Sequence, residues 1–179
     1  FIADIGYETY QKILEEAIQE LKESDFKELF KEEMSKKQTF VHGVEIDTDI
    51  EMLIPDSYVS NIQERLSLYT MLNKLESEAD IEQFDKMLKD RFGTVPNQVY
   101  ELYDGLRIRR IAKKSGFERI TLKNKKLICF FISNPQSVYY ETELFQKIIQ
   151  YIGTIGQFKG ITMKQNNTTL IMVRENVKT

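Results

Sequence analysis

The sequence has few of the residues that build disulfides, metal sites or rigid loops. Its 179 residues include one cysteine, one histidine, three prolines, eight glycines and no tryptophan. A single cysteine excludes a disulfide within the chain, which fits a reducing compartment such as the cytoplasm. One cysteine and one histidine exclude the usual structural zinc site. The low glycine and proline content excludes a collagen-like or low-complexity chain.

Long apolar runs are also missing. The longest, Leu127 to Ile132, is far shorter than the roughly 18 to 20 residues that a membrane span needs. We therefore expect no membrane segment and a cytoplasmic location. The chain opens at Phe1 rather than Met, and we expect it to be a fragment of a longer protein. Its length suits one domain, or two small ones that share a core.

The sequence carries no familiar catalytic motif. Neither GxxxxGK[ST] nor GxGxxG, which bind phosphates through backbone amides, is present. His42 and Cys129 each lie within an apolar pattern, without a partner motif that would make either one a base or a nucleophile. We expect a fragment without catalytic residues, cofactor or metal that does not bind ATP. An enzyme reading would require a carboxylate site that no motif reveals.

Charge is distributed unevenly along the chain. Residues 1–90 hold 22 acidic and 10 basic residues, whereas residues 91–179 hold 6 acidic and 15 basic residues. The basic excess is concentrated in residues 107–126. This asymmetry indicates either two solvated faces of opposite sign or a face that meets a charged partner.

The basic window 107–126 contains the candidate phosphate contacts. Three of them share one face of a predicted helix, and three mark the tip of a predicted hairpin: Arg107, Arg110 and Lys114, then Lys123, Lys125 and Lys126. Together they could contact nucleic-acid phosphates. No aromatic residues alternate with them, and the pI near 5.4 is unusual for a dedicated nucleic-acid binder. A non-specific nucleic-acid module is therefore the alternative function.

Hydrophobic spacing predicts helices and one acidic strand in the first two-thirds of the chain. Residues 7–23 have helical periodicity, and the charged residues 24–37 form a short helix or a connection. Strict alternation over residues 40–52 predicts a half-buried strand with acidic residues on its outer side. A capping box at Ser60 predicts the start of the next helix. Its expected buried stripe consists of Ile62, Leu66, Tyr69, Leu72 and Leu75.

Two more helices follow, with caps that are visible in the sequence. Asp80 is the expected N-cap of a helix that Gly93 ends. Pro96 suits the first turn of a helix that Gly116 ends. The expected stripe of this last helix is Val99, Leu102, Tyr103, Leu106, Ile108, Ile111 and Ala112.

The last third of the chain predicts a hairpin, a helix and a second hairpin. The first hairpin joins residues 117–122 and 127–132, the helix spans 142–152, and the second hairpin joins 158–164 and 168–175. The fold class is therefore α+β, with a small and mainly antiparallel sheet. We divide the chain into 1–37, 38–116 and 117–179, which together form one continuous unit.

Four stretches in order resemble the C-terminal domain of the bacterial transcription-repair coupling factors. They are Gly6-Tyr7-Glu8-Thr9-Tyr10, Leu53-Ile54-Pro55-Asp56-Ser57-Tyr58-Val59, Arg65-Leu66-Ser67-Leu68-Tyr69 and Asp90-Arg91-Phe92-Gly93-Thr94-Val95-Pro96. The last is similar to the DRFGxxP motif of the family. The resemblance covers roughly residues 1–116, and residues 117–179 fit by length and pattern only.

The resemblance implies a parent protein that is an ATP-driven double-stranded-DNA translocase. Such a parent displaces stalled RNA polymerase and recruits the excision-repair proteins. In this family the C-terminal domain is regulatory: it docks on a module that resembles UvrB and masks the surface that binds UvrA. The partners are therefore this intramolecular module and, through the parent, excision-repair proteins and RNA polymerase.

The DRFG corner is the candidate interdomain contact. Gly93 forces a sharp exit from one helix and Pro96 starts the next, so side chains beside this corner are pre-organised for a partner. The candidate residues are Met87, Asp90, Arg91 and Phe92. The family tends to have glutamate where this chain has Met87, so an apolar role is expected there. An internal contact of Asp90 or Arg91 that shapes the turn is the competing interpretation.

Overall fold

The computed structural model describes residues 40–41, 43–166 and 169–177. Its helices are α4 (Ile62–Leu72), α5 (Glu78–Phe92), α6 (Asn97–Ser115) and α7 (Glu143–Tyr151), with a short 3₁₀-helix at Val138–Glu141 and a π-helical turn at Ile152–Gly156. Its strands are β1 (Glu45–Thr48), β2 (Phe117–Lys123), β3 (Lys126–Phe131), β4 (Ile161–Asn166) and β5 (Thr169–Arg174). The predicted helix at 7–23, the segment 24–37 and His42 lie outside the described residues.

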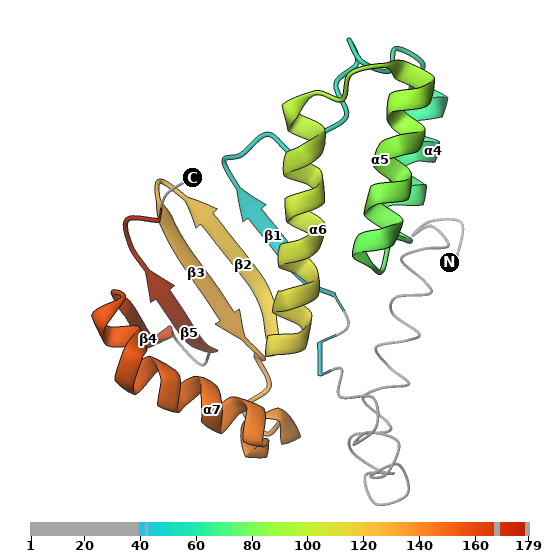
Figure 1. Cartoon of the computed structure of the whole chain (residues 1–179). Helices are drawn as coiled ribbons and strands as arrows, with labels where there is room; N and C mark the ends of the chain where they lie inside the picture. Colours follow the sequence, from blue (N-terminus) through green and yellow to red (C-terminus); the bar gives the residue numbers. More distant parts are fainter. Residues whose placement is uncertain (1–39, 42, 167–168, 178–179) are drawn as a thin grey trace, which may run out of the picture.

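The five strands form one sheet in the order β1-β2-β3-β5-β4 (Figure 1). β1 pairs in parallel with β2, and every other pair is antiparallel. The paired positions Ile120, Cys129 and Met172 share one face of this sheet. Side chains of both α6 and α7 join that face in a single apolar cluster. The α+β class and the mainly antiparallel sheet are thus confirmed, and none of the described helices is long and apolar enough to cross a membrane.

Two hydrophobic cores meet along α6. The first lies among α4, α5 and the N-terminal half of α6, where Leu88 and Val99 are fully buried. The second lies between the sheet, the C-terminal half of α6 and the residues around α7, with Phe131 and Tyr139 fully buried. Because α6 contributes Val99 to one core and Ala112 to the other, it connects the two halves of the described chain.

The acidic strand is shorter than its alternation predicts. Among the described residues of 40–52, the strand comprises Glu45–Thr48, whereas the pattern extends over the whole range. The Thr48 hydroxyl accepts a hydrogen bond from the Ile50 amide at 3.1 Å, so the backbone turns immediately after the strand. At the other end Val41 and Val44 are both buried, which an alternating strand does not allow.

The buried face of α4 differs from the predicted stripe. Ile62 and Leu66 are 61% and 55% exposed, whereas Leu68 and Leu72 are buried. The N-cap is Asn61 rather than Ser60, and its side chain accepts from the amides of residues 63 and 64. Tyr69, Leu72 and Leu75 of the predicted stripe do pack in the first core, so the prediction is correct toward the end of the helix and wrong at Ile62 and Leu66.

Local chemistry also sets the ends of α5 and α6. Ser77, not Asp80, is the N-cap of α5, and Asp80 completes the capping box as its third residue. Gly93 and Gly116 end the two helices as predicted, with φ angles of 84° and 78°. The predicted stripe of α6 fails at Ile111, which is 65% exposed and belongs to neither core.

The two hairpins form as predicted, with one difference. Asn124 and Lys125 have φ angles of 52° and 59°, which is the left-handed pair that a two-residue hairpin turn requires. The second hairpin starts at Ile161 rather than Phe158, which is 93% exposed. The π-helical turn at Ile152–Gly156 prolongs α7, so Phe158 still belongs to the helical segment before the sheet.

Candidate functional site

The DRFG corner is held in place from two directions. The Tyr58 hydroxyl lies 3.2 Å from the carbonyl oxygens of both Leu88 and Gly93 and shares its hydrogen bond between them. The rings of Tyr58 and Phe92 pack edge to face at 5.8 Å. Phe92 and Met87 are partly buried against the first core. The corner therefore has a fixed backbone, and two of its four candidate residues contribute mainly to packing.

Arg91 makes internal contacts. Its guanidinium group forms an ion pair with Glu64 of α4, donates to the Met87 sulfur at 3.8 Å, and lies 5.0 Å from the centre of the Phe92 ring. These contacts join the C-terminal end of α5 to the N-terminal end of α4. For Arg91 the internal interpretation is the one that this geometry favours.

Asp90 is the outward-facing member of the corner. It is exposed, and it makes no hydrogen bond or ion pair with any residue in 40–41, 43–166 or 169–177. Its neighbours Lys89 and Arg91 pair with Asp85 and Glu64 instead. An exposed carboxylate on a rigid corner can meet a cationic group of a partner with little loss of conformational entropy.

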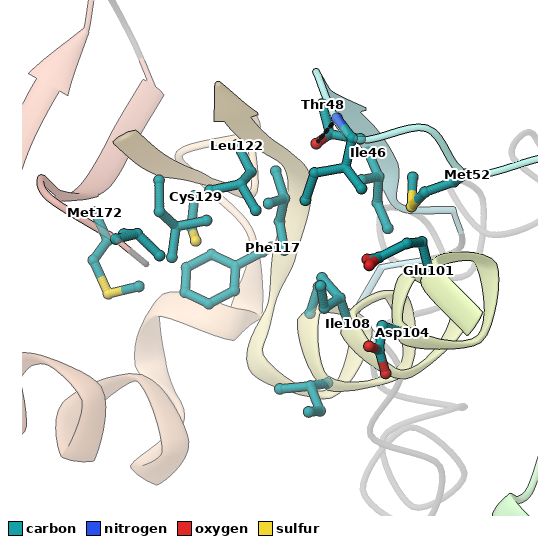
Figure 2. A pocket seen from close by; sticks show the side chains of 17 residues that line it. Ile46, Thr48, Met52, Glu101, Asp104, Ile108, Phe117, Leu122, Cys129 and Met172 are labelled. Carbon is teal, nitrogen blue, oxygen red and sulfur yellow. Dashed lines mark hydrogen bonds between the residues drawn. The ribbon is translucent and has the colours of Figure 1, made fainter. Parts of the chain in front are cut away.

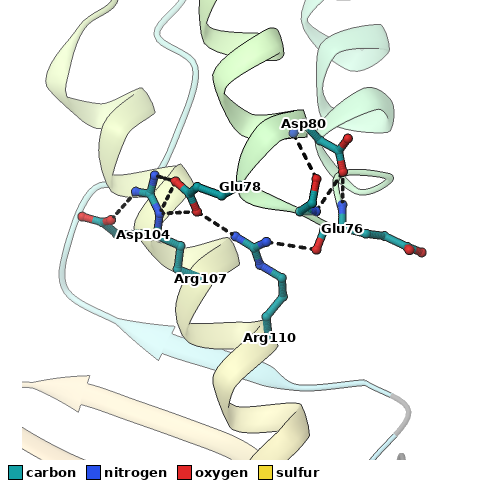
Figure 3. Close-up of polar contacts among 7 residues, drawn as sticks. Glu76, Glu78, Asp80, Asp104, Arg107 and Arg110 are labelled. Carbon is teal, nitrogen blue, oxygen red and sulfur yellow. Dashed lines mark hydrogen bonds and ion pairs between the residues drawn. The ribbon is translucent and has the colours of Figure 1, made fainter. Parts of the chain in front are cut away.

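Two arginines of the basic window hold α6 against the start of α5 (Figure 3). The Arg107 guanidinium pairs with the Glu78 carboxylate, and it donates to Asp104 at 2.7 Å. Arg110 donates to the Glu76 carbonyl at 2.9 Å and pairs with Glu78 at 3.3 Å. We call Glu78, Arg107 and Arg110 the α5–α6 ion cluster. Sequence reasoning missed it because Glu78 lies about 30 residues before its partners.

Hydrogen bonds in this region lower two carboxyl pKa values. Those from Arg107 are the main reason why the pKa of Glu78 lies below its usual value, with a smaller effect from Arg110. Hydrogen bonds from Ser77 and from the Glu76 amide lower the pKa of Asp80 in the same direction. Both groups are therefore held in the charged form at the N-terminus of α5, where a negative charge also suits the helix dipole.

The lysines at the hairpin tip are partly neutralised. Lys123 pairs with Asp47 of β1 at 2.6 Å, and Lys126 pairs with Glu175 at 3.3 Å. Lys114 and Lys125 are exposed and form no ion pair within the described part of the chain. Of the six candidate phosphate contacts, four are thus engaged by carboxylates, and the structure does not gather all six into one patch of unpaired cations.

An apolar cavity between α6 and the sheet is a second feature that sequence reasoning missed (Figure 2). It measures about 360 Å³. Residues of β1, β2, β3, β5 and α6 line it, among them Ile46, Ile108, Phe117, Cys129 and Met172. The alternation over residues 40–52 marks one side of it in the sequence, because Ile46, Thr48, Ile50 and Met52 all line the cavity. No group of three or more His, Cys, Asp or Glu side chains suited to a metal occurs among the described residues.

Comparisons with known proteins all point to one family. A family model described as "TRCF domain" matches residues 48–142. The transcription-repair-coupling factor of Rickettsia typhi is 25% identical over 176 residues, and that of Staphylococcus aureus (strain USA300) is 27% identical over 176 residues. Each alignment covers 98% of this chain and 14% of the relative, so the chain spans a small part of the length of these relatives.

A solved structure has the same fold. It is described as the crystal structure of the C-terminal domain of transcription-repair coupling factor, and it superposes with a TM-score of 0.60 at 20% identity. The match covers 76% of this chain and 82% of that one. The family model, by contrast, rests on sequence and spans more than half of the chain, including the DRFG corner and α6. The resemblance in the sequence is thereby confirmed, and the chain belongs to the TRCF domain family.

Proposed function

We propose that this chain is the regulatory C-terminal domain of an ATP-driven DNA translocase that couples transcription to nucleotide-excision repair. The observation that carries the proposal is the family match over residues 48–142. The fold shared with a structure described as a C-terminal domain supports the same position in the parent. Since the chain spans 14% of its relatives, the motor would be supplied by other parts of the parent.

The proposed role is autoinhibition by docking. The domain binds the UvrB-like module of its parent and masks the surface that UvrA would otherwise use. The rigid DRFG corner supports this role because Tyr58 and Arg91 fix it from both sides, while Asp90 remains exposed beside them. Docking through such a corner needs no rearrangement of the domain itself.

Asp90→Lys tests the docking surface. If Asp90 meets a cation of the UvrB-like module, reversing its charge weakens docking by about 1–3 kcal/mol, the usual range of coupling between sites. Calorimetric titration of the purified chain into the UvrB-like module measures this loss directly. In the full-length parent the same variant should raise the resting ATPase rate and UvrA binding.

The matched control is Glu141→Lys, which reverses an exposed carboxylate on the 3₁₀-helix far along the chain from the corner. It should leave docking unchanged. The melting temperature of the chain should be nearly unaffected by Asp90→Lys, because no described residue pairs with this side chain. A large fall in melting temperature without any loss of docking would show that the corner is structural and that the contact lies elsewhere.

The alternative function, a non-specific nucleic-acid module, rests on the exposed Lys114 and Lys125. It is the weaker proposal because Arg107, Arg110, Lys123 and Lys126 already pair with carboxylates. DNA binding whose salt dependence flattens in Lys114→Glu and Lys125→Glu would favour it.

A further inference from the structure

The cavity between α6 and the sheet has the size and the lining of a small-molecule site (Figure 2). Its volume of about 360 Å³ lies within the range of natural ligand sites, about 300 to 1,000 Å³. An apolar cavity of about 150 Å³ is enough to hold benzene. The space therefore suits a ligand roughly twice as large as benzene, such as an eight-carbon chain or a fused pair of aromatic rings.

The walls of the cavity are almost entirely apolar. Ile46 and Ile120 contribute branched side chains from neighbouring strands, and Met172 contributes a flexible thioether from β5. Cys129 is buried in the floor, and its burial raises the pKa of the thiol to about 12, so it is a neutral apolar group. The walls offer a ligand hydrophobic contact and almost no hydrogen bonding.

α6 forms one wall of the cavity, and at Gly105 this wall has no side chain. A Cβ atom at this position would lie 2.9 Å from the Met52 sulfur. Met52 therefore lies directly against the helix backbone at the edge of the cavity. Methionine is a flexible side chain that can move to admit a ligand at little cost.

One carboxylate places a negative charge at the otherwise apolar cavity. Glu101, one turn before Gly105 on α6, turns its carboxylate toward the cavity (Figure 2). It accepts a hydrogen bond from the side-chain amide of Asn97 at 3.2 Å, and it forms no ion pair within the described part of the chain. Asp104, the other acidic residue at the cavity, is neutralised by Arg107 at 2.7 Å. Glu101 is thus an anion available beside an apolar space.

We propose that this cavity binds a small apolar ligand with a positively charged end, whose apolar part fills the space between α6 and the sheet while its cation pairs with Glu101. Glu101 supplies the negative charge that the cation of the ligand complements, and the cavity volume sets the size of its apolar part. The site is separate from the DRFG corner and does not depend on the docking function.

Three eight-carbon probes test the proposal with the 179-residue chain: octylamine, octanol and octanoate. We expect calorimetry to show that octylamine binds at least about tenfold more tightly than octanoate, the difference that a charge-assisted hydrogen bond would give.

In NMR spectra the methyl signals of Met52 and Met172 should shift on binding, which locates the ligand in the cavity. Glu101→Gln should weaken the binding of octylamine about tenfold and leave the affinity for octanol unchanged.

Glu82→Gln is the matched control, because it removes an exposed carboxylate from α5 away from the cavity. It should change none of the three affinities. The proposal is overturned if no probe binds at millimolar concentration, if octanoate binds as well as octylamine, or if the methionine signals stay unchanged. Self-association of the chain that competes with octylamine would also overturn it, since the occupant would then be a second copy.

Discussion

Gly116 shows how a single residue decides the junction between α6 and the sheet. It has a φ of 78°, and a Cβ atom on it would lie 2.2 Å from the Tyr139 ring. Tyr139 is completely buried, and its hydroxyl donates to the Ser115 carbonyl at 2.7 Å. The absent side chain thus lets the ring lie against the end of α6, in the middle of the second core.

Gly116→Ala should therefore destabilise the chain strongly. The left-handed backbone costs about 1–2 kcal/mol for an L-residue, and the clash with Tyr139 adds about 1–3 kcal/mol of overpacking. Urea unfolding measures the sum. Gly153→Ala is the control, because a Cβ there meets nothing within 4 Å and the backbone is helical. Equal stabilities of the two variants would contradict this account of the junction.

The start of α5 is stabilised by charge as well as by packing. Its capping box satisfies backbone amides locally, whereas the α5–α6 ion cluster attaches the helix to α6. The pKa of Glu78 is lowered mainly by hydrogen bonds from Arg107. A carboxyl group whose pKa is lower in the folded state stabilises that state above its unfolded pKa, and the effect is lost as the pH falls.

Glu78→Gln should consequently lower stability at neutral pH but not in acid. The loss of unfolding free energy relative to the unaltered chain should be fully present above the ordinary glutamate pKa of 4.5. It should disappear as the pH falls below that value. Urea unfolding at a series of pH values measures this difference. In an Arg107→Gln background most of it should disappear, because the main partner is gone. A pH-independent difference would mean that Glu78 acts through packing alone.

At the scale of the whole molecule, α6 connects two cores that otherwise share few elements. Val99 and Tyr103 belong to the first core, and Ala112 belongs to the second. The three-part division expected from sequence places its last boundary at residue 116, at the end of this helix. A helix that contributes to both cores couples their stabilities, since unfolding either core exposes part of its apolar surface.

Leu88→Ala tests whether the two cores unfold together. Leu88 is fully buried in the first core, and its truncation should cost about 2–5 kcal/mol. In one cooperative unit, hydrogen exchange of the slowest amides should report the same loss near Leu88 and near Phe131. If protection falls only around Leu88, the halves are independent subdomains and the division at residue 116 is physical.

The sequence alone was sufficient for the features that depend on near neighbours. Helical and alternating spacing located the four described α-helices and the five strands to within a few residues, apart from the overlong β1 and the early start of β4. The 3₁₀-helix at Val138–Glu141 and the π-helical turn at Ile152–Gly156 were not predicted. Gly93 and Gly116 marked helix ends because positive φ angles favour glycine. The DRFG motif at Asp90–Gly93, taken in order with three further stretches, was enough to indicate the family before any fold was known.

Only the tertiary structure decided which faces and which charges meet. Ile62 and Leu66 have the spacing of a buried stripe, yet the contacts of α4 with the first core leave them exposed. Arg107 was predicted as a phosphate contact, but α5 places Glu78 beside it. Both outcomes depend on residues distant in the sequence, whose positions follow from how the helices pack. Periodicity defines an apolar face within one element, whereas the partner of that face is determined by the whole fold.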